Sequence, residues 1–397
     1  MIIGIVGKAN VGKSTFFKAA TLAEVEIANY PFTTIKKNEG VGFVSLDCVD
    51  RDFNVQCQPN HGYCLQGKRF VPVKLIDVAG LVPGASSGKG LGNQFLDDLR
   101  EADCLLHIVD ASGSSDENGE PLPPGSRNPV EDVLFLEAEL DAWYLNIFKK
   151  VWKSFITKAK QEKIEASKAI AKQFSGLKVS EQLVKQVIKE LSLSEDLATW
   201  TEQDLASFAS ALRKASKPML IVANKADVSI AKQNIEELKS RFEYKVIPCS
   251  AEAELALKEA AKKELISYVP GAGDFKVLKP EGLSNEQLKA LEFIKDKVLK
   301  VYGNTGVQQA LNTAVFELLK YIAVFPVANA KLQDNNGKVL PDCFLVPENT
   351  TALQLAFKIH TDLGENFIKA IDVKTGRVLG KDSVLQHRSV IEIVVKK

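Results

Sequence analysis

A glycine-rich segment near the start of the chain has the residue types that hold a phosphate chain. Gly7 and Gly12 bound it, Lys13 and Ser14 close it, an apolar run precedes it and a helical pattern follows. In this setting backbone N–H groups and a helix N-terminus bind phosphate oxygens. Lys13 would reach the terminal phosphates, and Ser14 would offer its hydroxyl to Mg²⁺. The predicted phosphate-binding residues are Gly7, Lys8, Ala9, Asn10, Val11, Gly12, Lys13, Ser14 and Thr15.

A second polar cluster ends another apolar run. Asp77 follows the run at 73–76, and Gly80 comes three positions later. A carboxylate in this place can hold Mg²⁺ through water, and a glycine N–H can lie beside the γ-phosphate. We therefore predict Asp77 as a magnesium ligand and Gly80 as a catalytic residue.

A third cluster indicates the base. Asp227 offers two acceptor oxygens to the ring N–H and the amine of guanine, whereas adenine has no proton at N1. Each lost charged hydrogen bond costs about 1.5–3 kcal/mol, so guanine should be preferred. Asn224 would brace the loop, Lys225 would cover the base, and the Ala251 amide would meet the guanine carbonyl. The predicted base-binding residues are Asn224, Lys225, Asp227, Ser250, Ala251 and Glu252.

Buried strands would position these clusters. Short apolar runs lie at 1–6, 73–76, 104–109, 219–222 and 245–248. Apolar strands that alternate with helices indicate a doubly wound α/β sheet, whose ligands bind beyond the carboxyl ends of the strands. Because each cluster follows such a run, the sequence predicts a Ras-like P-loop NTPase domain.

The rest of the chain predicts additional domains. A polar, proline-rich loop at 112–129 precedes helical periodicity that reaches about residue 216, and another helical pattern covers 284–323. Short β-like runs at 327–332, 343–346 and 390–395, with a helix at 353–360, indicate a β-grasp fold. The predicted limits are 1–128 and 214–275 for the P-loop domain, 129–213 for an inserted helical domain, 276–325 for a helical connection and 326–397 for the β-grasp domain.

Composition limits the class of protein. The 397 residues are 45% hydrophobic and 25% charged, which fits a folded protein of two or three domains. With a net charge of +1, attraction to nucleic acid would need a local patch. The lysine-rich stretch 149–172 could be such a patch, in contact with RNA phosphates, or it could be a solvated helix face. Nothing in the sequence indicates DNA as a partner. Few cysteines and no long apolar run predict a cytoplasmic protein without a membrane partner.

With these motifs in order, the chain resembles the Obg family of translation-factor-class GTPases, in particular its YchF-like branch. The resemblance rests on 29–35, on 77–85 and on the glycine-rich 88–96, together with 359–363 and 367–370, which fit the family's terminal TGS domain. It implies that a threonine of 29–35 binds Mg²⁺ when the γ-phosphate is present. Thr34 is favoured as this metal ligand, and Thr33 is left open. Thr34 and Lys13 are both expected to be catalytic residues. It also implies a ribosome or ribosomal RNA as partner.

Three positions refine the resemblance. YchF resembles an ATPase because its base motif lacks the aspartate, whereas Asp227 is present here and favours GTP and GDP. Leu81 stands where many GTPases have a water-orienting glutamine, so intrinsic hydrolysis should be slow. Asn10 resembles the asparagine of potassium-binding GTPases and could place K⁺ between phosphates, but asparagine also serves as a loop former.

The expected function is therefore a GTP-hydrolysing switch acting in translation or ribosome assembly. Two alternatives remain: a YchF-like ATPase, and an RNA-binding module in which nucleotide only stabilises the fold.

A few weaker signals remain open. Cys48, Cys57, His61 and Cys64 could bind zinc, but their spacing lacks a C-x2-C pair, so an ordinary loop is favoured, and a labile Cys57–Cys64 bridge is left open. His107 is expected to be a hydrogen-bonded core histidine, and His360 and His387 similarly.

Overall fold

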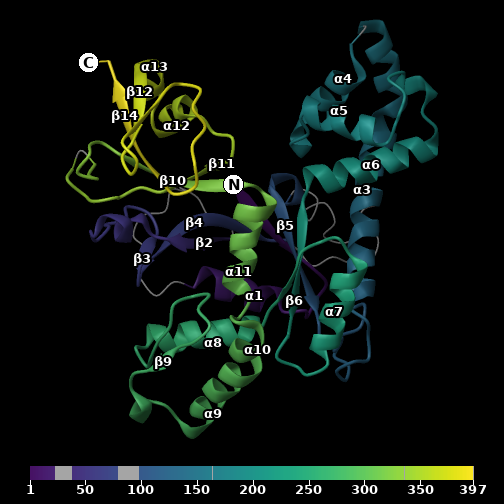
Figure 1. Ribbon diagram of the computed structural model, residues 1–397. Helices are drawn as coiled ribbons and strands as arrows, with labels where there is room; N and C mark the ends of the chain where they lie inside the picture. The colour runs from purple at the N-terminus through teal and green to yellow at the C-terminus, as the bar shows by residue number, and fades with distance from the viewer. Residues whose placement is uncertain (23–37, 79–97, 163, 335, 397) are drawn as a thin grey trace. The chain divides into compact units, whose positions relative to one another are not determined.

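The computed structural model describes residues 1–22, 38–78, 98–162, 164–334 and 336–396 (Figure 1). They form two compact units. The first contains Met1–Phe17 and Leu75–Ala253, and the second contains Lys18–Lys74 and Glu254–Lys397. The two units are compact parts of the chain. They do not test the predicted domain limits, which stay predictions.

A parallel sheet forms the centre of the first unit. Its strands are β1 (Ile2–Val6), the end of β4 (Lys68–Asp77), β5 (Cys104–Asp110), β6 (Met219–Asn224) and β7 (Val246–Pro248), in the order β4-β1-β5-β6-β7. The register places Val6 beside His107 and Asp110 beside Asn224. All residues of β5 and β6 are buried, as expected for parallel strands covered on both faces. The predicted α/β fold class is confirmed.

Helices account for most of the remaining first unit. They are the start of α1 (Lys13–Thr21), α3 (Val130–Glu162), α4 (Ala166–Gln173), α5 (Glu181–Glu190), α6 (Glu202–Ser216) and α7 (Ala231–Arg241). Helices α3 to α6 share an aromatic core, in which the Phe148 ring lies 4.1 Å from Phe174 and 5.6 Å from Phe208. A capping box of Thr201 and Asp204 starts α6. Among the described helices, none combines the length and apolar character needed to cross a membrane.

The second unit begins with a small antiparallel element. It contains β2 (Glu39–Asp47), the 3₁₀ turn Val49–Phe53, β3 (Tyr63–Leu65) and the start of β4; β3 pairs antiparallel with β4. The unit continues through α8 (Ala251–Lys262), β8 (Ile266–Ser267), β9 (Lys276–Val277), α9 (Asn285–Ile294), α10 (Lys300–Tyr302) and α11 (Val307–Asn312). Gln308 Nε2 donates to the Phe43 carbonyl at 2.8 Å, and Asn312 Oδ1 accepts from the Ser45 amide, so α11 is fixed to β2.

A five-stranded β-grasp sheet ends the chain, drawn in yellow-green and yellow in Figure 1. Its elements are β10 (Tyr321–Val327), β11 (Phe344–Pro347), α12 (Ala352–Ile359), α13 (Thr361–Glu365), β12 (Phe367–Asp372), β13 (Arg377–Leu379) and β14 (Ser389–Val395), with strand order β11-β10-β14-β12-β13. Leu355 of α12 packs with Val324 and Ile391 in the core of this sheet.

Two details of the prediction for this region are wrong. The helical pattern at 284–323 ends earlier, because the β-branched and aromatic run from Tyr321 forms β10 in the sheet. The strand predicted at 327–332 does not continue beyond Val327, since the chain turns there and Leu332 has a φ of 65°. The helix predicted at 353–360 is confirmed as α12.

Candidate nucleotide-binding site

A pocket of about 380 Å³ lies in the first unit at the carboxyl ends of β1, β6 and β7. It brings together most of the residues predicted to bind phosphate and base. The lining residues are Asn10, Gly12, Lys13, Ser14, Thr15, Asn224, Lys225, Asp227, Val228, Ser250, Ala251 and Glu252. Val228 was not predicted, although its place directly after Asp227 could have indicated it. Of the predicted residues, Gly7, Lys8, Ala9, Val11 and Asp77 are not in this lining.

The phosphate loop has the tight backbone that its glycines permit. Gly7 and Gly12 have φ angles of 149° and 95°, which disfavour other residues. A Cβ atom on Gly7 would lie 2.4 Å from the Ile108 carbonyl oxygen of the neighbouring strand. Lys13 Nζ folds back onto the Lys8 carbonyl at 2.5 Å. Burial lowers the pKa of Lys13, and the opposing charge of Asp77 limits this effect.

Asn224 joins the phosphate loop to the base-binding segments. Its Nδ2 donates to the Val11 carbonyl at 2.9 Å, and its Oδ1 accepts from the Ala251 amide at 3.0 Å. Both hydrogen bonds are buried, so one side chain at the end of β6 fixes two loops. The Ala251 N–H thus donates to Asn224, Ala251 lines the pocket, and the contact with a guanine carbonyl stays a prediction.

We expect Asn224→Ala to weaken GDP binding by about tenfold or more, because it leaves the Val11 carbonyl and the Ala251 amide without their partner. A buried group that loses its hydrogen bond costs about 1–3 kcal/mol. Calorimetric titration with GDP would measure the change. Asn234→Ala is the matched control, since Asn234 Nδ2 also donates to a backbone carbonyl, that of Ala111, away from the lining of the pocket. Equal affinities of both variants would contradict the bridging role.

The carboxylate of Asp227 lines the pocket without an ion pair to another described side chain. It is therefore positioned to accept hydrogen bonds from a ligand. Lys225 has a φ of 60°, and its Nζ pairs with Asp110 Oδ2 at 2.8 Å. This ion pair fixes the end of the Lys225 side chain and leaves its aliphatic part at the pocket wall.

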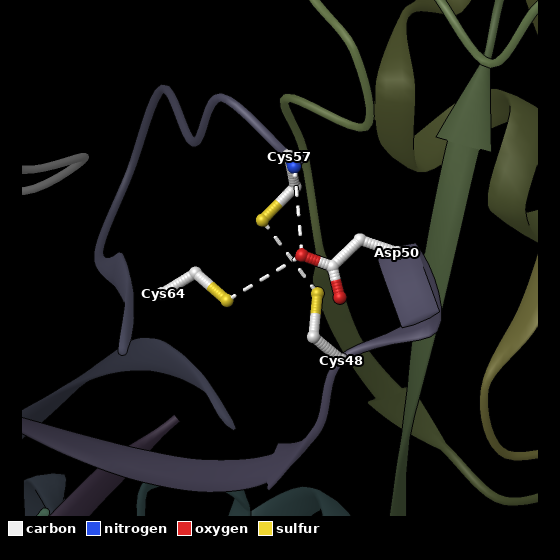
Figure 2. A group of neighbouring side chains, drawn as sticks. All are labelled: Cys48, Asp50, Cys57 and Cys64. Atoms are coloured by element: carbon white, nitrogen blue, oxygen red, sulfur yellow. Dashed lines mark hydrogen bonds between the residues drawn. The ribbon is translucent and has the colours of Figure 1, made fainter. Parts of the chain in front are cut away.

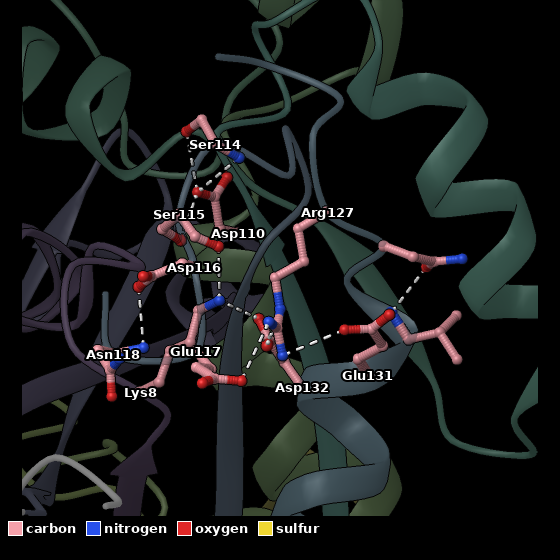
Figure 3. A network of polar contacts seen from close by, with 12 residues as sticks. Lys8, Asp110, Ser114, Ser115, Asp116, Glu117, Asn118, Arg127, Glu131 and Asp132 are labelled. Atoms are coloured by element: carbon pink, nitrogen blue, oxygen red, sulfur yellow. Dashed lines mark hydrogen bonds and ion pairs between the residues drawn. The ribbon is translucent and has the colours of Figure 1, made fainter. Parts of the chain in front are cut away.

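Asp110, which the sequence analysis did not single out, organises the loop after β5 (Figure 3). It is 1% exposed and accepts hydrogen bonds from Lys225 and from the hydroxyls of Ser112, Ser114 and Ser115. Burial by itself would raise its pKa, but the hydrogen bonds from Lys225 and the serines outweigh it and lower the pKa. The acidic residue at a strand end, followed by three serines, was the signal available in the sequence.

The phosphate loop is also held from its outer side (Figure 3). Lys8 Nζ forms a buried ion pair with Asp132 at 2.9 Å and donates to the Ser115 carbonyl at 2.9 Å. Asn10 has a φ of 60° and donates through Nδ2 to the Gly119 carbonyl. The side chain of Lys8 therefore anchors the loop, and only its backbone can serve the phosphate contact predicted for it. Asn10 acts as a loop former here, while its Oδ1 remains available for a cation.

The donor types at the mouth of the phosphate loop fit Mg²⁺, which prefers oxygen ligands. Ser14 presents a hydroxyl to the pocket, and Asp77 ends β4 close enough to Lys13 for their charges to interact. Burial raises the pKa of Asp77, with Lys13 opposing, so a further cation would favour its charged form. The other predicted residues of the hydrolytic site, Thr33, Thr34, Gly80 and Leu81, lie outside the described residues.

The histidines behave differently from one another. His107 is buried in β5, as expected for a core histidine; burial lowers its pKa to about 3, and its Nδ1 has no hydrogen-bond partner among the described atoms. His387 Nδ1 accepts from the Ala323 amide, as expected for a packed histidine. His360 is exposed and caps α13, so it is not a core residue.

Comparison with known proteins identifies the family. A family model described as "Obg-like GTPase YGR210-like, G4 motif-containing domain" matches residues 222–329, one described as "50S ribosome-binding GTPase" matches 2–130, and a TGS domain model matches 331–395. An uncharacterised GTP-binding protein of Methanocaldococcus jannaschii is 48% identical over 395 residues, covering 99% of this chain and 98% of that protein. The chain belongs to the Obg-like family of GTP-binding proteins.

Two other relatives are similar to this Obg-like protein over nearly its whole length. The crystal structure of a GTP-binding protein from Pyrococcus horikoshii OT3 is 40% identical, covers all of both chains and superimposes with a TM-score of 0.80. The ribosome-binding ATPase YchF of Buchnera aphidicola is 28% identical over 375 residues, which covers 94% of this chain and 88% of that protein. The predicted P-loop GTPase domain and terminal TGS domain are therefore confirmed.

Proposed function

We propose that this Obg-like protein is a molecular switch that binds GTP and GDP and hydrolyses GTP. The observation that carries the proposal is the bridge of Asn224, which holds the phosphate loop and the base-binding segments around one pocket. Phosphate and base can then be bound together, and Asp227 favours guanine over adenine. Thr34 and Gly80 would contact the Mg²⁺ and the γ-phosphate when GTP is bound, and hydrolysis would remove this contact.

Hydrolysis would depend on positioning and charge. The Lys13 ammonium would stabilise the negative charge that develops on the terminal phosphates, and the neighbouring backbone N–H groups would orient them. Ser14, Thr34 and Asp77 would hold Mg²⁺, which supplies further charge stabilisation when bound. Leu81 can neither donate nor accept a hydrogen bond, so another group must orient the attacking water. K⁺ bound near Asn10, or a partner, could take over this role.

The proposed partner is the ribosome. Support comes from the name of the YchF relatives, ribosome-binding ATPase, and from the family description that matches 2–130. Lys149 and Lys160 of the lysine-rich stretch form ion pairs with Glu202 and Asp196, at 3.6 and 3.7 Å. This stretch is therefore partly neutralised, and its contact with RNA stays a prediction.

We expect GTP turnover to be slow for the protein alone in sodium buffer, and to rise roughly tenfold or more with K⁺ or ribosomes, since charge supplied in trans can accelerate hydrolysis by up to about 10³–10⁵. Phosphate release would be measured in sodium and potassium buffers of equal ionic strength, with and without purified ribosomes. Equal rates in the two buffers would remove the potassium hypothesis.

Sedimentation with ribosomes separates a switch from a passive binder. In the proposed function, retention on ribosomes differs between GDP and a non-hydrolysable GTP analogue. Identical retention would favour the RNA-binding module, and faster turnover of ATP than GTP would favour the ATPase.

A further inference from the structure

Three cysteines and one aspartate converge in the second unit, outside the nucleotide pocket (Figure 2). One potential ligand atom from each of Cys48, Asp50, Cys57 and Cys64 lies within 4.8 Å of all the others. The Sγ atoms of Cys48 and Cys57 are 3.7 Å apart, and Cys64 Sγ is 3.8 Å from Asp50 Oδ2. Cys48, Asp50 and Cys57 are buried, and Cys64 is half-buried.

The separation of the Cys48 and Cys57 sulfurs matches one edge of a metal coordination tetrahedron. Zinc binds thiolate at about 2.3 Å, so two sulfurs of a tetrahedral site are about 3.7–3.8 Å apart. A disulfide would need about 2.05 Å, and all six cysteines are free. Three sulfurs and one carboxylate oxygen form a closed set of four ligands, as in structural zinc sites. We propose that Cys48, Asp50, Cys57 and Cys64 bind one structural Zn²⁺ ion.

Separate local elements bring these ligands together. Cys48 and Asp50 belong to the 3₁₀ turn after β2, where Asn54 takes a φ of 54° and reverses the chain. Cys57 comes from the following loop, and Cys64 from β3. The sequence analysis favoured an ordinary loop because it looked for a C-x2-C pair on one turn. The structure differs from that expectation in two respects: Cys57 and Cys64 are free thiols, and Asp50 completes the cluster while His61 is exposed and lies outside it.

Two buried polar groups near the cluster, the Asp50 carboxylate and the Arg69 guanidinium, lack a full set of partners among the described residues. Asp50 Oδ1 is buried and has no hydrogen-bond partner among the described atoms. Arg69 is 0% exposed, and within the described residues it binds the carbonyls of Leu340 and Pro341 but no carboxylate. A buried guanidinium without an anion is costly. Zinc with three thiolates and one carboxylate carries a net negative charge, which would compensate Arg69 and engage Asp50.

Even without metal, the sulfurs interact. The Cys48 thiol donates to Cys57 Sγ, and the Cys64 thiol donates to Asp50 Oδ2. Zinc binding would displace the remaining thiol protons into solvent, as for other thiolate sites. The ion would then replace weak sulfur hydrogen bonds by four ligand bonds.

The site would have a structural task in the second unit. The loop that carries Cys57 pairs with the β-grasp segment, because the Gln58 amide donates to the Val339 carbonyl at 2.8 Å and the Asn60 amide to Pro341 at 2.9 Å. A zinc ion that fixes Cys57 to Cys48 and Cys64 would therefore also stabilise the hydrogen bonds between this loop and segment 339–341. This role is separate from nucleotide binding and goes beyond the proposed function.

The test is a metal analysis of the full-length protein, kept reduced and freed of loosely bound metal by a weak chelator. We expect one zinc per chain in the wild type and in Cys343→Ser, a control thiol of the same unit that is not in the cluster. Cys57→Ser should bind added ZnCl₂ at least roughly 100-fold more weakly, since it removes one of four ligands. CoCl₂ added to the metal-free wild type should give a thiolate-to-cobalt charge-transfer band, which does not depend on a variant that might unfold.

Three results would overturn the proposal. They are a reduced wild type that neither contains nor takes up zinc, a cobalt complex without a thiolate band, and a Cys57→Ser variant that keeps its zinc. A wild type in which two thiols resist alkylation until reduced, with no metal present, would instead show a disulfide.

Discussion

Asp227→Asn should weaken GDP binding by at least roughly 100-fold and make xanthosine diphosphate the preferred ligand. In the proposed function the carboxylate accepts two hydrogen bonds from the guanine edge, and each charged hydrogen bond lost costs about 1.5–3 kcal/mol. An asparagine keeps one acceptor oxygen but turns an N–H₂ group toward the guanine amine. Xanthine has a carbonyl at that position, so it can accept from the asparagine and restore the pair.

Calorimetric titration of both nucleotides into wild type and variant would measure this exchange of specificity. Asp196→Asn is the matched control, because it makes the same change at an exposed position of the helical region, outside the pocket lining. If Asp227→Asn binds GDP as well as the wild type does, Asp227 does not read the base. Tight binding of ATP by the wild type would require the ATPase alternative.

Gly12→Ala should abolish detectable nucleotide binding, because no room exists for its methyl group. A Cβ atom at this position would lie 2.2 Å from Asn224 Nδ2, and the φ of Gly12 is 95°. Asn224 cannot move aside without breaking its bonds to Val11 and Ala251. The substitution therefore strains the backbone of the phosphate loop. It also breaks the bridge through which Asn224 joins this loop to the segment that begins α8.

Binding would be followed by calorimetry, and folding by thermal unfolding without ligand. Gly176→Ala provides the comparison, since no atom lies within 4 Å of its added Cβ and its φ is not positive. That control should bind GDP normally. Binding by Gly12→Ala within about threefold of wild type would show that the loop relaxes freely and that the bridge does not control the site.

Local motifs made the phosphate and base loops predictable. Gly12, Lys13 and Asp227 carry their chemistry in short segments whose neighbouring strands and helices are also local, and the structure brings them to one pocket. The alternating apolar runs likewise predicted β5 and β6, because parallel strands buried on both faces have few other sequence patterns.

Contacts between distant segments were not predictable in this way. Lys8 and Asp132 are far apart in sequence, and nothing in either segment indicates that they pair. The first three residues of β10, 321–323, were predicted as helix, because their pairing with β11 in the sheet is not visible in the local sequence pattern. The four residues of the cysteine cluster come from a 3₁₀ turn, the loop after it and β3, so no single short motif indicates that they meet.

The buried ion pair between Lys8 and Asp132 gives α3 the geometry of a lever. Asp132 lies in the first turn of a helix of 33 residues, so at 1.5 Å per residue the far end of the helix is about 45 Å from Asp132. A tilt of about 5° at the phosphate loop would carry that far end about 4 Å, by the rigid-rod geometry of a continuous helix. A small change of orientation at the phosphate loop would thus move the far end of α3 by a distance comparable to the length of a side chain.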